Sequence, residues 1–252
     1  MNIVFPMCGL GTRVKERFNT PKPFIDINGK TLIERCIDGM KLNGNYVFIT
    51  RKFTEFENCE ELYYQTIELF SKYTSLENII VVDHLTSGAV STLLLAQDII
   101  DTEEPLLISN CDQIWNLDTE KILNLMSEDH VDGFVSTWQF PNIRINEKSP
   151  YSFAKLNDLG YVIEIKEKFA ISENSMNGLF YWTHGSDFIT CAKQLINSGN
   201  DLCGEFYVSE TYNYAINLGK NIKIHKMTND EYISLGTTEE ILQYYNKSET
   251  LS

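Results

Sequence analysis

A glycine-containing turn near the N-terminus carries the residues best suited to chemistry. Segment 7–13 reads Met-Cys-Gly-Leu-Gly-Thr-Arg and directly follows a strand-like run. Glycines allow tight turns and let backbone amides approach phosphate oxygens closely. Arg13 ends the turn, and a second cation, Lys22, stands between two prolines that stiffen its segment. Two such cations can neutralise a triphosphate and the charge that develops on departing pyrophosphate.

Two familiar phosphate-binding patterns do not describe this turn. A dinucleotide fingerprint needs a third glycine where Val14 stands, and a P-loop needs Gly-Lys-Ser or Gly-Lys-Thr after four intervening residues. The plain alternative is that Arg13 and Lys22 are ordinary basic residues of a surface loop. We interpret the turn as a nucleotide loop of another kind.

Asp112 is the candidate metal ligand. It follows the buried-looking run 106–109, so we expect it at the carboxyl end of a central strand, where open α/β sheets bind ligands. Magnesium prefers carboxylate and phosphate oxygens and keeps several waters, so one protein carboxylate with NTP phosphates can suffice. The alternative role is a turn or helix-capping aspartate.

Small residues precede an apolar helix at Ser87-Gly88-Ala89. Their size would let a base or a ribose approach the backbone. The alternative is an N-cap, in which Ser87 satisfies free amides of the helix, and both roles are compatible.

The elements that position these residues alternate between strand and helix patterns. The runs 79–82 and 106–108 lack polar alternation, as expected of central strands covered on both faces. The patterns predict strands at 2–7, 46–50, 78–83, 105–110 and 132–138, and helices at 31–42, 54–74, 88–100 and 118–128. The predicted fold is a three-layer α/β/α sandwich with a mixed, mostly parallel sheet.

The second half has a different pattern. Segment 152–165 predicts a β-hairpin around an Asn-Asp-x-Gly turn. A strand at 178–183, helices at 187–197 and 205–218 and a strand at 221–227 follow. We expect one domain over 1–252, with a nucleotide-binding half (1–140), an acceptor-binding half (141–245) and a short polar tail after Tyr245.

Composition limits the kinds of partner. The 252 residues are 43% hydrophobic and carry a net charge of -14, which argues against nucleic acid because phosphate neutralisation needs clustered cations. No apolar run approaches a membrane span and no leader pattern is visible, so we expect a cytoplasmic protein without a membrane partner. The six cysteines form no CxxC pair, and reduced thiols are expected.

Several segments together resemble the sugar-phosphate nucleotidyltransferase family. The resemblance spans nearly the whole chain, in order, through Gly9-Leu10-Gly11-Thr12-Arg13, Pro21-Lys22-Pro23, Gly29-Lys30, Ser87-Gly88-Ala89, Asn110-Cys111-Asp112-Gln113, Glu167-Lys168, Gly204-Glu205-Phe206-Tyr207 and Leu235-Gly236-Thr237. It implies transfer of a nucleoside monophosphate from an NTP to a phosphorylated small molecule, with release of pyrophosphate.

The resemblance also implies roles for residues. Arg13 and Lys22 would act on the triphosphate and Asp112 on Mg²⁺, as the catalytic set. The nucleotide-binding set is Met7, Cys8, Gly9, Leu10, Gly11, Thr12, Ser87, Gly88 and Asn110. The acceptor-binding set is Glu167, Lys168, Asn177 and Gly178, with Lys166 as an alternative to Lys168.

Two positions depart from the family pattern. Phe169 replaces the usual proline after Glu-Lys, and Ser234 stands where the family often has a second metal carboxylate. Asp230 or Glu231 could substitute, or the metal could depend mainly on Asp112. A glycosyltransferase would be expected to show Asp-x-Asp, whereas residue 114 is Ile. A non-catalytic nucleotide-binding regulatory subunit is a further alternative.

Within the family, the chain resembles small cytidylyltransferases of capsule and surface-polysaccharide biosynthesis, such as CTP:phosphoglutamine cytidylyltransferases. This resemblance implies CTP as donor and phosphoglutamine as acceptor, with phosphocholine or a sugar 1-phosphate as competing acceptors. The base, the acceptor and the oligomeric state, including a homo-oligomer, are left open by the sequence.

Overall fold

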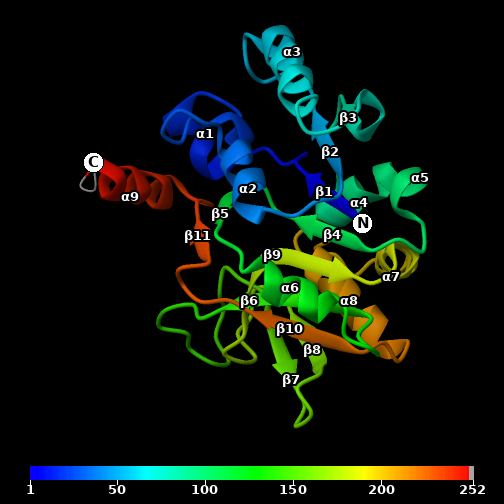
Figure 1. Ribbon diagram of the computed structural model, residues 1–252. Coiled ribbons are helices and arrows are strands. Elements are labelled where there is room, and N and C mark those ends of the chain that lie inside the picture. Colours follow the sequence, from blue (N-terminus) through cyan, green and yellow to red (C-terminus); the bar gives the residue numbers. More distant parts are fainter. Residues whose placement is uncertain (250–252) are drawn as a thin grey trace.

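A nine-stranded sheet forms the middle layer of the protein (Figure 1). The computed structural model describes residues 1–249. The main path of the sheet runs β10-β6-β9-β4-β1-β2-β3, and the hairpin β7–β8 joins it at β9. The strands are β1 (Asn2–Pro6), β2 (Asn45–Arg51), β3 (Ile79–Val82), β4 (Leu106–Ser109), β6 (Gly133–Trp138), β7 (Phe153–Leu156), β8 (Val162–Lys166), β9 (Ser175–Trp182) and β10 (Ile222–Lys226).

The sheet is mixed and mostly parallel, as predicted. β1 pairs in parallel with β2 and β4, β2 with β3, and β6 with β10. β9 is antiparallel to both β4 and β6, so it separates two parallel groups of strands. The carboxyl ends of β1, β4 and β6 therefore meet the amino end of β9 at one edge of the sheet.

Helices cover both faces of the sheet and complete the three layers (Figure 1). Along β1, Val4 packs into one core cluster while Ile3 and Phe5 pack into the other, because successive strand residues point to opposite faces. The helices are α1 (Thr12–Phe18), α2 (Leu32–Met40), α3 (Cys59–Phe70), α4 (Ala89–Leu93), α5 (Gln97–Ile100), α6 (Thr119–Met126), α7 (Gly185–Ser198), α8 (Val208–Asn217) and α9 (Thr238–Glu249). Short 3-10 turns are at Lys22–Phe24, Leu76–Asn78 and Leu94–Ala96.

Several predicted boundaries were wrong. The helix expected at 88–100 is divided into α4, a 3-10 turn and α5. Over three residues the difference between about 3.0 and 3.6 residues per turn is too small to show in an apolar pattern. α8 begins at Val208 rather than residue 205, because Phe206 instead bonds to the backbone of Ser87.

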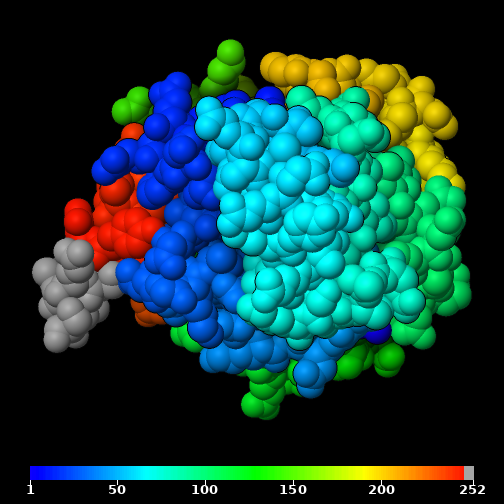
Figure 2. Space-filling model, turned by 90° about the horizontal axis from the view of Figure 1, so that it is seen from above, coloured from blue at the N-terminus to red at the C-terminus, as the bar shows by residue number. Residues whose placement is uncertain are grey.

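The C-terminal segment is a helix rather than the polar tail expected after Tyr245. α9 runs to Glu249 and buries Ile241 against Val14 of α1 and Leu32 of α2. Figure 2 shows this red C-terminal segment against the blue N-terminal part of the chain. The last residues of the expected tail, 250–252, lie outside the described residues.

Two further elements position the site, and one of them was not predicted. β5 (Gln113–Trp115) and β11 (Tyr232–Ser234) form a small antiparallel sheet in which Ser234 lies opposite Gln113. The expected hairpin β7–β8 is present, and the Asn157 side chain accepts bonds from two backbone amides of its turn. No helix among residues 1–249 is long and apolar enough to span a membrane. The division into two functional halves stays a prediction.

Candidate active site

The glycine turn continues β1 and then leaves the sheet. The amide of Met7 still bonds to Ile49 of β2, at 2.7 Å. Met7 and Cys8 are buried, whereas Gly9 and Leu10 are exposed. Burial raises the pKa of Cys8 to about 11, so its thiol is neutral and its part in ligand binding would be limited to the backbone. Gly11, at φ 62°, turns the chain into α1.

Lys22 and Asp112 meet beside this turn. The Lys22 ammonium donates to Asp112 Oδ2 at 2.6 Å and to the carbonyl of Gly236 at 2.8 Å. A Cβ on Gly11 would lie 3.2 Å from the Cβ of Lys22, so the turn packs directly on the lysine. The turn, the Pro-Lys-Pro segment, the end of β4 and the late Gly-Thr thus form one site.

Charge keeps Asp112 ionised. Burial acts to raise the pKa of this carboxyl, but the Lys22 charge and hydrogen bond, with a smaller contribution from Arg13, hold it below its usual range. Arg13 is exposed, and its carbonyl accepts a 2.9 Å bond from the Thr238 hydroxyl at the start of α9. The predicted catalytic set Arg13, Lys22 and Asp112 is therefore brought together.

The space above Gly236 is ringed by oxygen atoms. A Cβ on Gly236 would lie 3.6 Å from Asp112 Oδ2, 3.4 Å from Glu240 Oε2 and 3.7 Å from Ser234 Oγ. Carboxylate and hydroxyl oxygens that approach one another in this way suit Mg²⁺, which completes its coordination with waters and substrate phosphates. In residues 1–249, no three His, Cys, Asp or Glu side chains gather as a metal cage, so substrate oxygens would have to contribute.

The two acids suggested as substitutes for residue 234 do not join this ring. Glu231 accepts bonds from the amide and hydroxyl of Thr228 and lies near Lys121 of α6. Asp230 is exposed in the same turn. Glu240, which the sequence did not single out, is the acid that reaches Gly236.

Close packing against a neighbouring backbone segment requires a glycine at residue 88, in addition to any role in ligand binding. A Cβ there would lie 2.7 Å from both the amide and the carbonyl of Phe206, and φ is 95°. The Phe206 amide donates to the Ser87 carbonyl at 2.9 Å, and the Phe206 carbonyl accepts from Val90 at 3.2 Å. The Ser87 side chain is exposed and does not cap α4, so the N-cap interpretation was wrong.

Lys168 is held beside Tyr207. Its ammonium donates to the Tyr207 hydroxyl at 2.5 Å and lies 4.5 Å from the centre of that ring. Glu167 accepts bonds from the hydroxyls of Ser152 and Ser209, the latter at 2.6 Å. Glu167 thus ties the hairpin to α8 and positions Lys168, while Lys166 is exposed.

Asn110 and Gly178 belong together at the end of β4. The Asn110 amide donates to the Gly178 carbonyl at 3.0 Å, and a Cβ on Gly178 would lie 2.3 Å from the Asn110 side-chain nitrogen. Gly178 therefore makes room for Asn110. Asn177 is buried and donates to Met227 Sδ at 3.1 Å, whereas its Oδ1 has no protein partner among the described residues.

The sequence patterns did not reveal an aromatic rim, which is formed by Trp138, Phe140, Tyr151 and Tyr232. The ring centroids of Phe140 and Tyr151 are 4.7 Å apart, and those of Trp138 and Tyr232 are 4.9 Å apart. Tyr151 also hydrogen-bonds with Ser234, so the rim adjoins Asp112. Two of these rings, Phe140 and Tyr151, lie in an irregular segment, and the other two end β6 and begin β11, so no single periodic pattern contains them. For Glu240, the Thr-x-x-Glu capping pattern was a readable signal.

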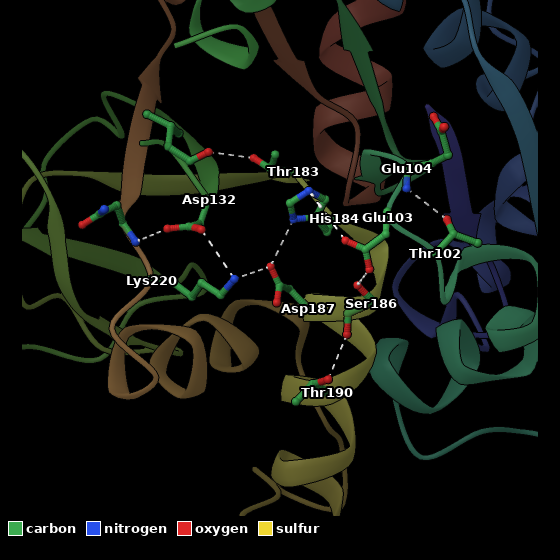
Figure 3. A network of polar contacts seen from close by, with 12 residues as sticks. Thr102, Glu103, Glu104, Asp132, Thr183, His184, Ser186, Asp187, Thr190 and Lys220 are labelled. Atoms are coloured by element: carbon green, nitrogen blue, oxygen red, sulfur yellow. Dashed lines mark hydrogen bonds and ion pairs between the residues drawn. The ribbon is translucent and has the colours of Figure 1, made fainter. Parts of the chain in front are cut away.

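A separate polar network lies at the opposite end of the sheet (Figure 3). Lys220 contacts Asp187 at 2.6 Å and Asp132 at 3.5 Å, and His184 lies 3.6 Å from Asp187. These residues surround the start of α7, so the network joins structural elements away from the candidate site.

The fold is shared with solved structures of nucleotide-handling enzymes. A nucleoside-diphosphate-sugar pyrophosphorylase from Vibrio cholerae RC9 has a TM-score of 0.79 at 22% identity, over 97% of this chain and 99% of its own. A UDP-glucose pyrophosphorylase complexed with UDP-glucose has a TM-score of 0.75 at 16% identity, over 100% of this chain and 99% of its own. An inositol-1-phosphate CTP transferase from T. maritima has a TM-score of 0.66 at 16% identity, over 98% of this chain and 94% of its own.

No family model and no curated protein matches the sequence. At these identities the structural likeness establishes the fold alone, a three-layer α/β/α sandwich. It covers nearly the whole of each chain.

Proposed function

We propose that this protein is a magnesium-dependent nucleotidyltransferase. It joins a nucleoside monophosphate from an NTP to a phosphorylated small molecule and releases pyrophosphate. The observation that carries the proposal is the Lys22–Asp112 contact of 2.6 Å beside the glycine turn. This contact lies at the carboxyl end of parallel strands, where α/β sheets bind ligands.

The chemistry requires positioning and charge neutralisation. An oxygen of the acceptor phosphate attacks the α-phosphorus of the NTP in line, the bond to the β-phosphate oxygen breaks, and pyrophosphate leaves. Lys22 and Arg13 face the triphosphate and offset the charge on the leaving group. Mg²⁺, bound through Asp112, would neutralise phosphate charge and orient the α-phosphate. Gly9 and Gly11 present backbone amides to phosphate oxygens.

The donor is CTP. The resemblance of the sequence to small cytidylyltransferases supports this choice, and one structure of the same fold is an inositol-1-phosphate CTP transferase. Residues 9–12, of which Gly9, Leu10 and Thr12 are exposed, form the nucleotide side of the proposed site together with Ser87 and Gly88. Asn110, exposed at the end of β4, borders it.

The acceptor is phosphoglutamine, for which Lys168 supplies the phosphate contact. Lys168 is tethered by a hydroxyl rather than by a carboxylate, so its positive charge stays available for a phosphate. Phosphocholine and sugar 1-phosphates are the competing acceptors. The product would be made in the cytoplasm and would be used to decorate a capsule or another surface polysaccharide.

Pyrophosphate release tests the proposal. The purified protein with Mg²⁺ is incubated with CTP, UTP, dTTP, ATP or GTP, each against phosphoglutamine, phosphocholine and hexose 1-phosphates. Release with one NTP and one acceptor supports the proposal and names both substrates. NTP binding with no release across the panel favours a regulatory nucleotide-binding subunit instead.

A further inference from the structure

We propose that Glu240 supplies the second carboxylate of the magnesium site, in place of the acid missing at residue 234. The inference rests on the proposed function and names a ligand that the sequence resemblance does not assign. Glu240 Oε2 and Asp112 Oδ2 lie 3.4 and 3.6 Å from the same point above Gly236. Both carboxylates thus approach the same side of Gly236, with Ser234 Oγ 3.7 Å from that point.

The Glu240 carboxylate is held in place by the start of α9. Its Oε2 accepts from the Thr237 amide at 2.9 Å and from the Thr237 hydroxyl at 3.2 Å, while the Glu240 amide donates back to that hydroxyl at 3.3 Å. This is a capping box, in which glutamine serves as well as glutamate. The cap therefore explains the fixed position of the side chain but does not require its negative charge.

The charges around Tyr151 show which way Glu240 faces. Burial raises the pKa of the Tyr151 hydroxyl, and the next largest effect is the charge of Glu240; Asp112 also raises it and Arg13 lowers it. Tyr232 is affected by the same two carboxylates. Glu240 therefore lies on the side of α9 that faces Asp112 and the aromatic rim.

The two carboxylates also determine the charge balance of the proposed site. Asp112 and Glu240 offset the charges of Lys22 and Arg13, so a triphosphate entering the site meets little net positive charge. A divalent cation between the two carboxylates and the phosphates restores the balance. Gly236 has no positive φ, and a methyl group there would lie in ordinary contact with the three oxygens.

Mn²⁺ binding, followed by its electron paramagnetic resonance signal in the presence of CTP, tests the assignment without needing turnover. Glu240→Gln keeps the cap, so its unfolding midpoint in urea should stay close to that of the wild type. Its affinity for Mn²⁺ should fall by more than about tenfold, the loss seen even for outer-shell partners of metal sites. Glu239→Gln changes an exposed acid of the same helical turn and should leave Mn²⁺ affinity unchanged.

A rescue variant separates the ligand role from the cap. Ser234→Asp added to Glu240→Gln places a carboxylate on the same ring and should restore most of the Mn²⁺ affinity. Unchanged Mn²⁺ affinity in Glu240→Gln, or a loss that Ser234→Asp does not restore, would overturn the assignment. A wild type that binds Mn²⁺ with CTP through Glu240 yet releases no pyrophosphate would refute the proposed reaction alone.

Discussion

The ammonium of Lys22 donates to the carboxylate of Asp112 across 90 residues of sequence, at a distance of 2.6 Å. The same ammonium donates to the Gly236 carbonyl, so three distant segments share one cation. These two bonds hold Lys22 beside the glycine turn. The first prediction concerns this lysine.

Replacing Lys22 by Met should lower kcat/KM for pyrophosphate release by about 10²–10³-fold, the usual loss when one charge-stabilising donor is removed. The reason is that the leaving pyrophosphate loses a positioned cation. The matched control is Lys72→Met, because Lys72 is an exposed lysine on the α3 side. Steady-state kinetics with both substrates varied would measure the effect, and equal rates for the two variants would contradict the role of Lys22.

Replacing Gly88 by Ala should destabilise the protein by about 1–3 kcal/mol, the cost of a strained backbone conformation. The added methyl group would meet the Phe206 backbone at 2.7 Å, which should also raise the KM for NTP. Gly160→Ala is the control, because Gly160 has a similar φ of 82° but open space around it. Urea unfolding compares the two, and an equal cost would show that the Phe206 contact contributes nothing.

Replacing Trp138 by Ala should raise the KM of the acceptor several-fold, on the order of 1 kcal/mol for lost ring contacts, with little change in the KM of NTP. Trp138 packs on Tyr151 and Tyr232, at ring separations of 5.8 and 4.9 Å, and so supports the rim beside Asp112. Kinetics with each substrate varied in turn measure the split. A rise in the KM of NTP alone would place the rim on the other substrate.

Replacing Lys220 by Met should lower stability by about 1 kcal/mol without changing kcat/KM, because its ion pairs are partly exposed and far from the site. Burial acts to lower the pKa of Lys220, but its bonds to Asp187 and Asp132 raise it above 10.5. Because the pKa of Lys220 is higher in the folded than in the unfolded protein, its positive charge stabilises the fold at pH values below the unfolded-state pKa. This contribution is lost as the pH rises through the folded-state pKa. The difference between wild type and variant in urea unfolding should therefore persist at neutral pH and shrink above pH 10.5. A stability gap that widens with alkalinity would contradict this.

The sheet could be predicted because its central strands are buried on both faces. Runs such as 106–108 can be apolar throughout only where helices cover both sides, and that fixes the layers and the place of Asp112. The place of Asp112 near the glycine turn followed from the carboxyl ends of parallel strands lying at one edge, whereas its contact with Lys22 was not predicted.

Other parts of the site depend on long-range pairing that no local pattern records. Glu240 reaches Asp112 only because β11 pairs with β5 and carries Gly236 over the end of β4. The small residues 87–89 were interpreted as a nucleotide contact or, through Ser87, as an N-cap. The neighbour of Gly88, Phe206, lies in a segment that the sequence assigned to a helix. Residues 246–249 of the expected polar tail continue α9, which is anchored upstream by Ile241 in a cluster with Val14 of α1, a helix too short to be recognised from its pattern.

The most direct test of the account is Mg²⁺-dependent pyrophosphate release by the wild type and by Asp112→Asn, with CTP and phosphoglutamine and with the rest of the substrate panel. The account predicts release by the wild type that EDTA abolishes, and a loss of about 10²-fold or more in Asp112→Asn. Release that is indifferent to EDTA and to the substitution at Asp112 would contradict the central claim, as would NTP binding without release from any pair of substrates.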